Sequence, residues 1–408
     1  MLKDKKLSDY ADLVLEIGVN LQEGQGLEIS CPVESREVAI ALTESAYRHG
    51  AKLVRVRWND EIIERINFLN AQTEALTEIP KWLVDSRNYL IEKNYCYVAI
   101  SAEDPNAFVG VPASKLGEVA KAKSKALKKF SDCVMANGIR WCVVSVPTEK
   151  WAKQVFPDAE NPMENLSTAI EKSMRLDCSD PVSSWKEHVA RLDRRAEYLN
   201  FKRFEYLHFT SANGTDLKVG LAQQHVWLSA KEKAKDGVSF IANLPTEEIF
   251  TAPHKDKVNG IVKSAMPLIY NGQTIDKFSL TFKNGKVVSY SAEIGQDALG
   301  ELIKTDSGTC RIGEVALIGK NSPIAKSNIL FYNTLFDENA SCHLALGKAY
   351  PTTIKDGELL SLKDLKALGA NDSVEHVDFM IGSQDMNIIG INSDGEETIL
   401  FYDGDWVF

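Results

Sequence analysis

The sequence lacks the features of a secreted or membrane-embedded protein. Its 7 cysteines stand singly and no Cys-x-x-Cys pair occurs, so we expect reduced thiols rather than a disulfide framework. No stretch reaches the roughly 18 consecutive apolar residues that a membrane helix needs. The first 21 residues are amphipathic instead of continuously apolar, unlike a signal peptide. We therefore expect a cytoplasmic protein with no membrane partner.

Signatures of nucleotide and nucleic-acid binding are also missing. No G-x-x-x-x-G-K-[ST] motif occurs, and the glycines of QEGQG precede a predicted strand, whereas a phosphate-binding loop follows one. The chain has 47 Lys and Arg against 57 Asp and Glu, a net charge of −10, with no basic stripe. We expect no nucleic-acid partner and interpret the acidity as a solvated surface.

The length and patterning of the chain predict two domains. At 408 residues, it exceeds the size at which one hydrophobic core usually stops growing. Helix-length segments separate four predicted strands in the first part of the chain, at 26–31, 51–58, 96–101 and 140–147. This alternation favours a largely parallel sheet covered by helices. With a helical connector over about 148–200, it gives an N-terminal α/β domain over residues 1–200.

Residues 201–408 have a different pattern, of short strands and turn signals, which predicts an α+β domain. The candidate ligands of a catalytic metal site, described below, all lie in this domain. Asn213-Gly214, Asn284-Gly285 and Asp394-Gly395 interrupt alternating runs and predict hairpins. Between them we expect helices at 294–304 and 338–348 and a strand at 312–319.

The stretch SVEHVDFMIG predicts a strand with two potential metal ligands on one face. Alternation places His376 and Asp378 together, with Val377 and Phe379 on the other face. An imidazole and a carboxylate would be costly to bury without a partner, and a divalent cation satisfies both. The alternative is a strand whose polar face meets solvent.

A second candidate cluster is LFDENASCHLALGKAY. If this stretch is a helix, Glu338 and His343 are about 140° apart around it, so both reach one cation only if Glu338 lies at the helix entrance. Asp337 or Asn339 could cap such a helix. The alternative is a solvated helix start with a satisfied histidine.

Two further acidic positions are candidates. Glu314 interrupts the apolar strand RIGEVALIG, where a lone carboxylate is poorly tolerated unless it is paired or binds a cation. Glu247 and Glu248 lie in an extended segment, where one side chain could point inward and the other face water. The residue pattern does not decide between these two.

Three glutamates, two histidines and one aspartate form a donor set large enough for two divalent ions with a shared carboxylate. Such a pair activates a water for peptide hydrolysis, and a nearby tyrosine could donate a hydrogen bond to the oxyanion. Another metal-dependent amidase, a dipeptidase or a deaminase is an alternative. An interaction protein with a structural metal is another.

Four motifs are similar to those of the thermophilic aminopeptidase family: NLPTEEIFTAPHKDKVNGIV (243–262), RIGEVALIG (311–319), LFDENASCHLALGKAY (335–350) and EHVDFMIG (375–382). The resemblance extends over nearly the whole chain. It implies a metal-dependent aminopeptidase, acting on peptides with a free N-terminus and forming a homodimer. The family's metal ligands fall on Glu248, Glu314, Glu338, His343, His376 and Asp378.

The resemblance also implies roles for individual residues. It favours Glu248 over Glu247 and makes Tyr350 the active-site tyrosine. We expect Glu314 to be the ligand that bridges the two metals, since it lies in the most apolar strand. The metal itself stays open, because carboxylate and imidazole ligands suit zinc, cobalt and manganese alike.

Overall fold

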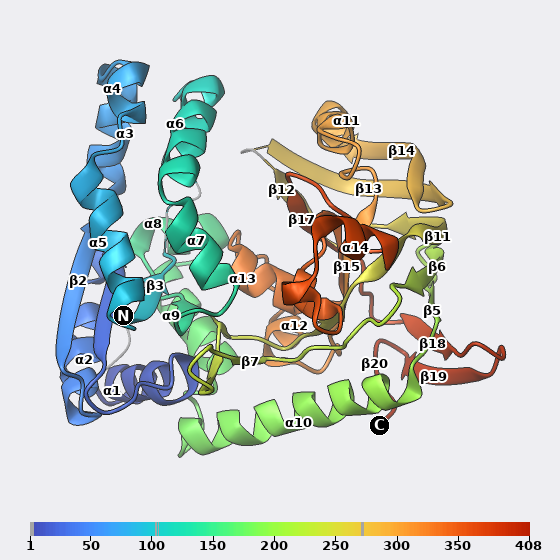
Figure 1. Cartoon of the computed structure of the whole chain (residues 1–408), viewed down its shortest axis with the longest axis horizontal. Helices are drawn as coiled ribbons and strands as arrows, with labels where there is room; N and C mark the ends of the chain where they lie inside the picture. Colours follow the sequence, from blue (N-terminus) through green and yellow to red (C-terminus); the bar gives the residue numbers. More distant parts are fainter. Residues whose placement is uncertain (1–3, 103, 105, 271–272) are drawn as a thin grey trace. The chain divides into compact units, whose positions relative to one another are not determined.

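The computed structural model describes residues 4–102, 104, 106–270 and 273–408 (Figure 1). It divides into two compact units, Met1–His188 with Lys231–Pro245 and Val189–Ala230 with Thr246–Phe408, here called unit 1 and unit 2. Helix α10 (Pro181–Lys202) runs from unit 1 into unit 2. The boundary expected after residue 200 therefore lies inside a helix.

Unit 1 contains a five-stranded sheet in the order β2-β1-β3-β4-β9, in which all neighbouring strands are parallel. The strands are β1 (Gly26–Pro32), β2 (Leu53–Asn59), β3 (Cys96–Ile100), β4 (Trp141–Val144) and β9 (Asn243–Leu244). Every residue of the inner strand β1 is buried, whereas the edge strand β2 alternates. This confirms the predicted α/β layer with its parallel sheet.

The connections of unit 1 are helical. They comprise α1 (Asp4–Leu13), a π-helix (Val14–Gly18), a 3-10 turn (Val33–Ser35), α2 (Arg36–Arg48), α3 (Glu61–Asn70), α4 (Thr73–Thr77), α5 (Lys81–Glu92), α6 (Ala113–Ala126), α7 (Lys128–Met135), α8 (Glu149–Val155) and α9 (Pro162–Ser173). Two consecutive helices, α6 and α7, precede strand β4. None of the helices in the described ranges is long and apolar enough to cross a membrane.

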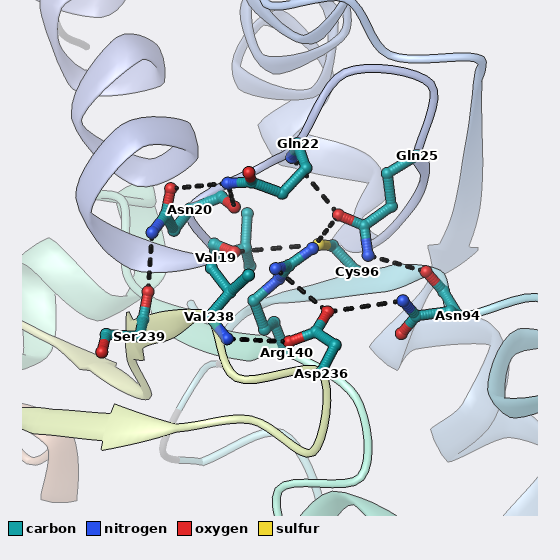
Figure 2. Close-up of polar contacts among 10 residues, drawn as sticks. All are labelled: Val19, Asn20, Gln22, Gln25, Asn94, Cys96, Arg140, Asp236, Val238 and Ser239. Atoms are coloured by element: carbon teal, nitrogen blue, oxygen red, sulfur yellow. Dashed lines mark hydrogen bonds and ion pairs between the residues drawn. The ribbon is translucent and has the colours of Figure 1, made fainter.

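A second segment of the chain returns to unit 1 as the hairpin β7 (Lys231–Lys233) and β8 (Ser239–Ile241). Arg140, only 1% exposed, holds this hairpin (Figure 2). Its Nη1 lies 3.2 Å from Asp236 Oδ2, and its Nη2 donates to Gln25 Oε1. Asn20 Nδ2 adds a bond of 2.7 Å to the carbonyl of Ser239. A buried guanidinium thus joins three segments that are distant in sequence.

Unit 2 contains two larger sheets. One has four antiparallel strands in the order β10-β15-β16-β17, namely Ile249–Thr251, Ile312–Leu317, His343–Gly347 and His376–Met380. The other has nine strands: β5 (Tyr206–Thr210), β6 (Asp216–Leu221), β11 (Pro253–Lys263), β12 (Leu268–Tyr270), β13 (Gln273–Lys283), β14 (Lys286–Ile294), β18 (Asn387–Ile391), β19 (Glu397–Tyr402) and β20 (Asp405–Trp406).

Short helices complete unit 2: α11 (Gln296–Lys304), α12 (Pro323–Ser327), α13 (Thr334–Asp337) and α14 (Leu362–Ala367), with 3-10 turns η3 (Glu338–Ala340), η4 (Pro351–Thr353) and η5 (Gly357–Leu359). The three predicted hairpins are present as β5-β6, β13-β14 and β18-β19. At one of them, Asn284 and Gly285 have φ of 49° and 78°, as the twist of a two-residue hairpin turn requires.

The helix expected over 338–348 is wrong. Residues Glu338–Ala340 form a single 3-10 turn, and His343–Gly347 form strand β16, which is buried along its whole length. A short apolar run that is covered on both faces has no clear period, so its sequence does not distinguish strand from helix. The condition that Glu338 begin a helix shared with His343 therefore does not apply.

Candidate metal centre

Strands β15, β16 and β17 bring polar side chains onto one face of the four-stranded sheet. Glu314 lies opposite Ala345, which in turn lies opposite Asp378. His343 precedes Ala345 by two positions, and His376 precedes Asp378 by two positions. Because residues two apart in a strand share a face, both imidazoles and both carboxylates project from the same side of the sheet.

His343 is the centre of this cluster. Its Nε2 lies 3.4 Å from Glu314 Oε1, 3.5 Å from Glu248 Oε2 and 3.9 Å from Asp378 Oδ1. His376 Nε2 lies 3.4 Å from Asp378 Oδ1 and 3.9 Å from Glu314 Oε2. The imidazole of His343 thus contacts carboxylates from strands β15 and β17 and from the segment before β10.

The ligand atoms form two overlapping groups. One consists of Glu248, Glu314 and His343, and the other of Glu314, His376 and Asp378; within each group the atoms lie within 4.8 Å of one another. Glu314 belongs to both. The arrangement could therefore hold two neighbouring cations that share one carboxylate.

Backbone carbonyls orient the two imidazoles. His376 Nδ1 lies 2.7 Å from the carbonyl oxygen of Lys348, and His343 Nδ1 lies 3.4 Å from that of Ser341. Since a carbonyl only accepts, Nδ1 carries a proton in each ring, and Nε2 is the nitrogen that faces the carboxylates and is available to a cation. Metal-binding histidines are commonly held in this way.

A glycine gives His376 its position. Gly347 lies opposite His376 and has a φ of 112°. A Cβ atom at Gly347 would lie 2.1 Å from the carbonyl oxygen of Glu375. Any other residue would therefore separate β16 from β17 at the point where His376 enters the cluster.

Glu338 approaches the cluster from outside the sheet, as the first residue of η3. Its pKa is raised well above the usual value by burial, and next by the negative charges of Glu248 and Asp378. Glu338 is thus a fourth buried acid at the site, although it belongs to neither of the two groups described above.

Tyr350 covers one side of the cluster. Its ring centroid lies 4.7 Å from that of His376 and 6.4 Å from that of Phe250. Burial, followed by the charge of Glu314, raises the pKa of its hydroxyl. Tyr350 therefore keeps its proton at neutral pH and can donate a hydrogen bond.

The electrostatics of the cluster match a cation-binding site. Burial raises the pKa of Glu248 to about 8, in part because Glu314 and Asp378 are close. Burial disfavours charged His343, but the carboxylates around it, chiefly Glu314, outweigh this and raise its pKa to about 10. The same balance, led by Asp378, raises the pKa of His376 to about 9. In the metal-free protein, protons would therefore occupy the ligand atoms that a metal would otherwise bind.

Two buried oxygens test the fit to a metal directly. Within the described residues, Glu314 Oε2 and Asp378 Oδ1 accept no hydrogen bond, and both lie near His376 Nε2, at 3.9 and 3.4 Å. An unpaired buried carboxylate oxygen is costly. Both oxygens point into the mixed oxygen and nitrogen donor set that divalent zinc, cobalt or manganese would accept. The residues present therefore fit such ions.

All seven residues singled out from the sequence converge in unit 2, and Glu248 rather than Glu247 contacts His343. Three other features were not predicted: Phe250 against Tyr350, Ala345 between two acids, and Asn339 bound to the backbone of Glu247. Phe250 could have been noticed, because it stands two residues after Glu248 and shares its face of an extended segment.

A buried cluster of carboxylates and imidazoles on a rigid sheet is characteristic of a metalloenzyme. The family model described as thermophilic metalloprotease (M29) matches residues 3–406. The chain belongs to this family and is thus a metalloprotease, a hydrolase of peptide bonds. The resemblance inferred from the four motifs is confirmed.

Several characterised proteins are similar over almost their whole length. Aminopeptidase 2 of Geobacillus stearothermophilus is 44% identical, covering 99% of this chain and 98% of the relative. Aminopeptidase AmpS of Bacillus subtilis is 40% identical, covering 99% of each. The structure of wild-type AmpT from Thermus thermophilus matches with a TM-score of 0.93 at 36% identity, covering 99% of both chains. These relatives are all named as aminopeptidases or AmpT.

Proposed function

We propose that the chain is an aminopeptidase that releases N-terminal residues from peptides by means of a water activated by two divalent metals. The observation that carries the proposal is the pair of overlapping donor groups that share Glu314. Charge balance supports the number of metals, since Glu248, Glu314, Glu338 and Asp378 provide four negative charges, which two divalent cations neutralise. The names of the relatives support the substrate class.

Bound at these positions, two divalent ions would lower the pKa of a shared water and polarise the scissile carbonyl. Glu314 would contribute to both positions, and its carboxylate is held in place because it lies in the buried strand β15. His343 and Glu248 complete one position, and His376 and Asp378 complete the other. Glu338, electrostatically coupled to Glu248 and Asp378, supplies a further carboxylate.

Tyr350 is positioned to act on the developing negative charge. Its ring is fixed between His376 and Phe250, and its hydroxyl stays protonated at neutral pH. A hydrogen bond from this hydroxyl would be stronger to the negatively charged oxygen of the transition state than to the carbonyl oxygen of the bound peptide, and it would thus lower the barrier.

We further propose that the protein is cytoplasmic and forms a homodimer. All seven cysteines are free in the structure, which supports a reducing compartment. The dimer is supported by the family resemblance, and light scattering of the purified protein in solution measures it directly.

The proposed function is tested by removing and restoring the metal. Chelated protein should hydrolyse no aminoacyl-amide, and zinc, cobalt or manganese added singly should restore activity as two ions bind per chain. A matched peptide with an acetylated N-terminus serves as the control and should not be cleaved. Cleavage of the blocked peptide at an equal rate would refute an aminopeptidase, and a stoichiometry of one would refute the two-metal arrangement.

A further inference from the structure

The candidate ligands of the metal centre are held by two different kinds of structure. Glu314, His343, His376 and Asp378 lie in strands β15 to β17, where main-chain ladders fix their spacing. Glu248 and Glu338 lie outside these ladders. Glu248 directly precedes the first residue of β10, and Glu338 is in the 3-10 turn η3. A separate device must therefore set the distance between the two loop-borne carboxylates.

Asn339 is placed to be that device. It follows Glu338 in the chain and is completely buried. Its Oδ1 accepts a hydrogen bond of 2.8 Å from the backbone N–H of Glu247, which directly precedes Glu248. One side chain thus links the backbones beside both loop-borne ligands, across 92 positions of sequence.

The other end of the same amide is also fixed. Asn339 Nδ2 donates a hydrogen bond of 3.0 Å to the carbonyl of Leu335 in helix α13. Helix carbonyls near a C-terminus lack partners within the helix, so this bond both completes α13 and orients the amide. With both ends used, the side chain has one orientation in which Oδ1 faces Glu247.

Glu248 is consequently held from both sides. Ile249, the residue after it, pairs with Leu317 in the sheet, and Glu247, the residue before it, is held by Asn339. A ligand that is fixed only at one neighbour could rotate away from His343, whose Nε2 lies 3.5 Å from Glu248 Oε2. The bond from Glu247 to Asn339 therefore adds a second anchor to the backbone that carries this carboxylate.

We infer that Asn339 is a positioning residue for the metal position formed by Glu248, Glu314 and His343, acting through the backbone of Glu247. The inference rests on the proposed two-metal function. Under this inference the two metal positions depend on Asn339 to different extents. The position formed by Glu314, His376 and Asp378 is set by the strands that carry these residues, whereas the position that includes Glu248 also needs the amide of Asn339.

The test is metal binding by calorimetry and elemental analysis, with zinc and manganese titrated into chelated protein. Asn339→Leu keeps the volume of the side chain and removes both hydrogen bonds. We expect one site to bind as in the wild type and the other to weaken by about 10- to 100-fold, the usual effect of losing an orienting partner. Asn339→Asp keeps the acceptor for Glu247 and should retain both sites.

Asn200→Ala is the matched control. Asn200 also links two segments of unit 2, accepting from Trp227 N at 2.8 Å and donating to Trp227 O at 2.9 Å, and neither Asn200 nor Trp227 adjoins a candidate metal ligand in the sequence. A merely structural role of Asn339 predicts that Asn339→Leu and Asn200→Ala lower the melting temperature of the chelated protein and leave both metal affinities unchanged. That result would overturn the inference.

Two other outcomes are distinguishable. If Asn339→Leu weakens both metal sites, Asn339 does not serve a single metal position. If Asn339→Asp loses one site, Asn339 does not act through the oxygen that accepts from Glu247. If Asn339→Leu does not fold, Asn339→Ala replaces it, because it also removes both hydrogen bonds. The wild type is titrated first, and the variants are compared with it only if it binds two ions per chain. A wild type that binds one ion refutes the proposed two-metal function rather than the role of Asn339.

Discussion

Glu314 and Asp378 lie on the same row of the four-stranded sheet, separated by a single residue, Ala345 of the strand between them. Opposite positions on neighbouring strands are about 5 Å apart, so the two carboxylates reach over a methyl group rather than a large side chain. The small residue in the middle leaves room for ions between the acids. Ala345 itself is fully buried.

Replacing Ala345 with leucine should therefore block the metal centre. The larger side chain points into the space between Glu314 and Asp378, and overpacking costs about 1–3 kcal/mol of stability. We expect metal affinity to fall by at least about tenfold, because metal sites tolerate little displacement of their ligands. Calorimetric metal titration measures it.

Leu344→Met is the control for this substitution. Leu344 is buried on the opposite face of β16, and a volume-conserving change there costs less than about 1.5 kcal/mol. Metal affinity should be unchanged. Equal metal binding by Ala345→Leu and the wild type would show that the space beside Ala345 is not where the ions lie.

Substitution of the shared ligand should affect both metal positions. In Glu314→Gln, an amide replaces the carboxylate that belongs to both donor groups, and an amide nitrogen cannot bind a cation. We expect kcat/KM for an aminoacyl-amide to fall by at least about 100-fold, with the far-ultraviolet circular dichroism unchanged. Activity like that of the wild type would contradict the two-metal hypothesis.

The hydroxyl of Tyr350 should be needed for turnover but not for metal binding. Phenylalanine keeps the ring packed against His376 and Phe250 and removes only the donor. Loss of one oxyanion donor lowers kcat by about 100- to 1000-fold. Steady-state kinetics and metal analysis of Tyr350→Phe separate the two effects, and a change confined to KM would argue against this role.

The metal-free protein should lose stability as the pH rises. Folding raises the pKa of Glu248 from 4.5 to about 8, so across this window the folded state holds a proton that the unfolded state has released. The free energy of unfolding then falls with increasing pH. His343 and His376, with pKa values raised from 6.5 to about 10 and about 9, stabilise the fold fully below pH 6.5 and lose this contribution as the pH rises through 9 to 10.

Bound metal should remove much of this dependence, because it replaces the protons on the ligands. Melting temperatures from pH 5 to 9, measured in parallel with and without chelator, check the prediction. We expect a decline equivalent to a few kcal/mol in the chelated protein and a flatter curve in the loaded one. A chelated protein that gains stability from pH 5 to 9 would contradict it.

In unit 1, Arg140→Met should destabilise the fold without affecting the metal centre. The substitution leaves Asp236 and Gln25 without their buried partner. Because the side chain of Asp236 is 31% exposed, water compensates part of the loss, and we expect a cost of about 2 kcal/mol rather than the 3–5 of a fully buried pair. Urea denaturation measures this, and metal stoichiometry should stay that of the wild type.

Local chemistry in the sequence determined much of the secondary structure. The Asn-Gly turns predicted hairpins because their residues accept positive φ, and the helix-length segments between the first four strands predicted a parallel sheet. The same rules failed at 338–348. There the strand β16 is covered on both faces, so tertiary burial removed the alternation that would have marked it.

The sequence by itself determined which donor atoms the metal centre can use, because His376 and Asp378 share a face of any strand and an acid inside the apolar run at Glu314 requires a partner. Only the tertiary structure decided that Glu314 lies within 4.8 Å of His343, which is 29 positions later, and of His376, which is 62 positions later. It also revealed the spacer Ala345 and the amide of Asn339. The physical reason is that strand register and long-range hydrogen bonds arise between segments, and neither leaves a periodic signal within one of them.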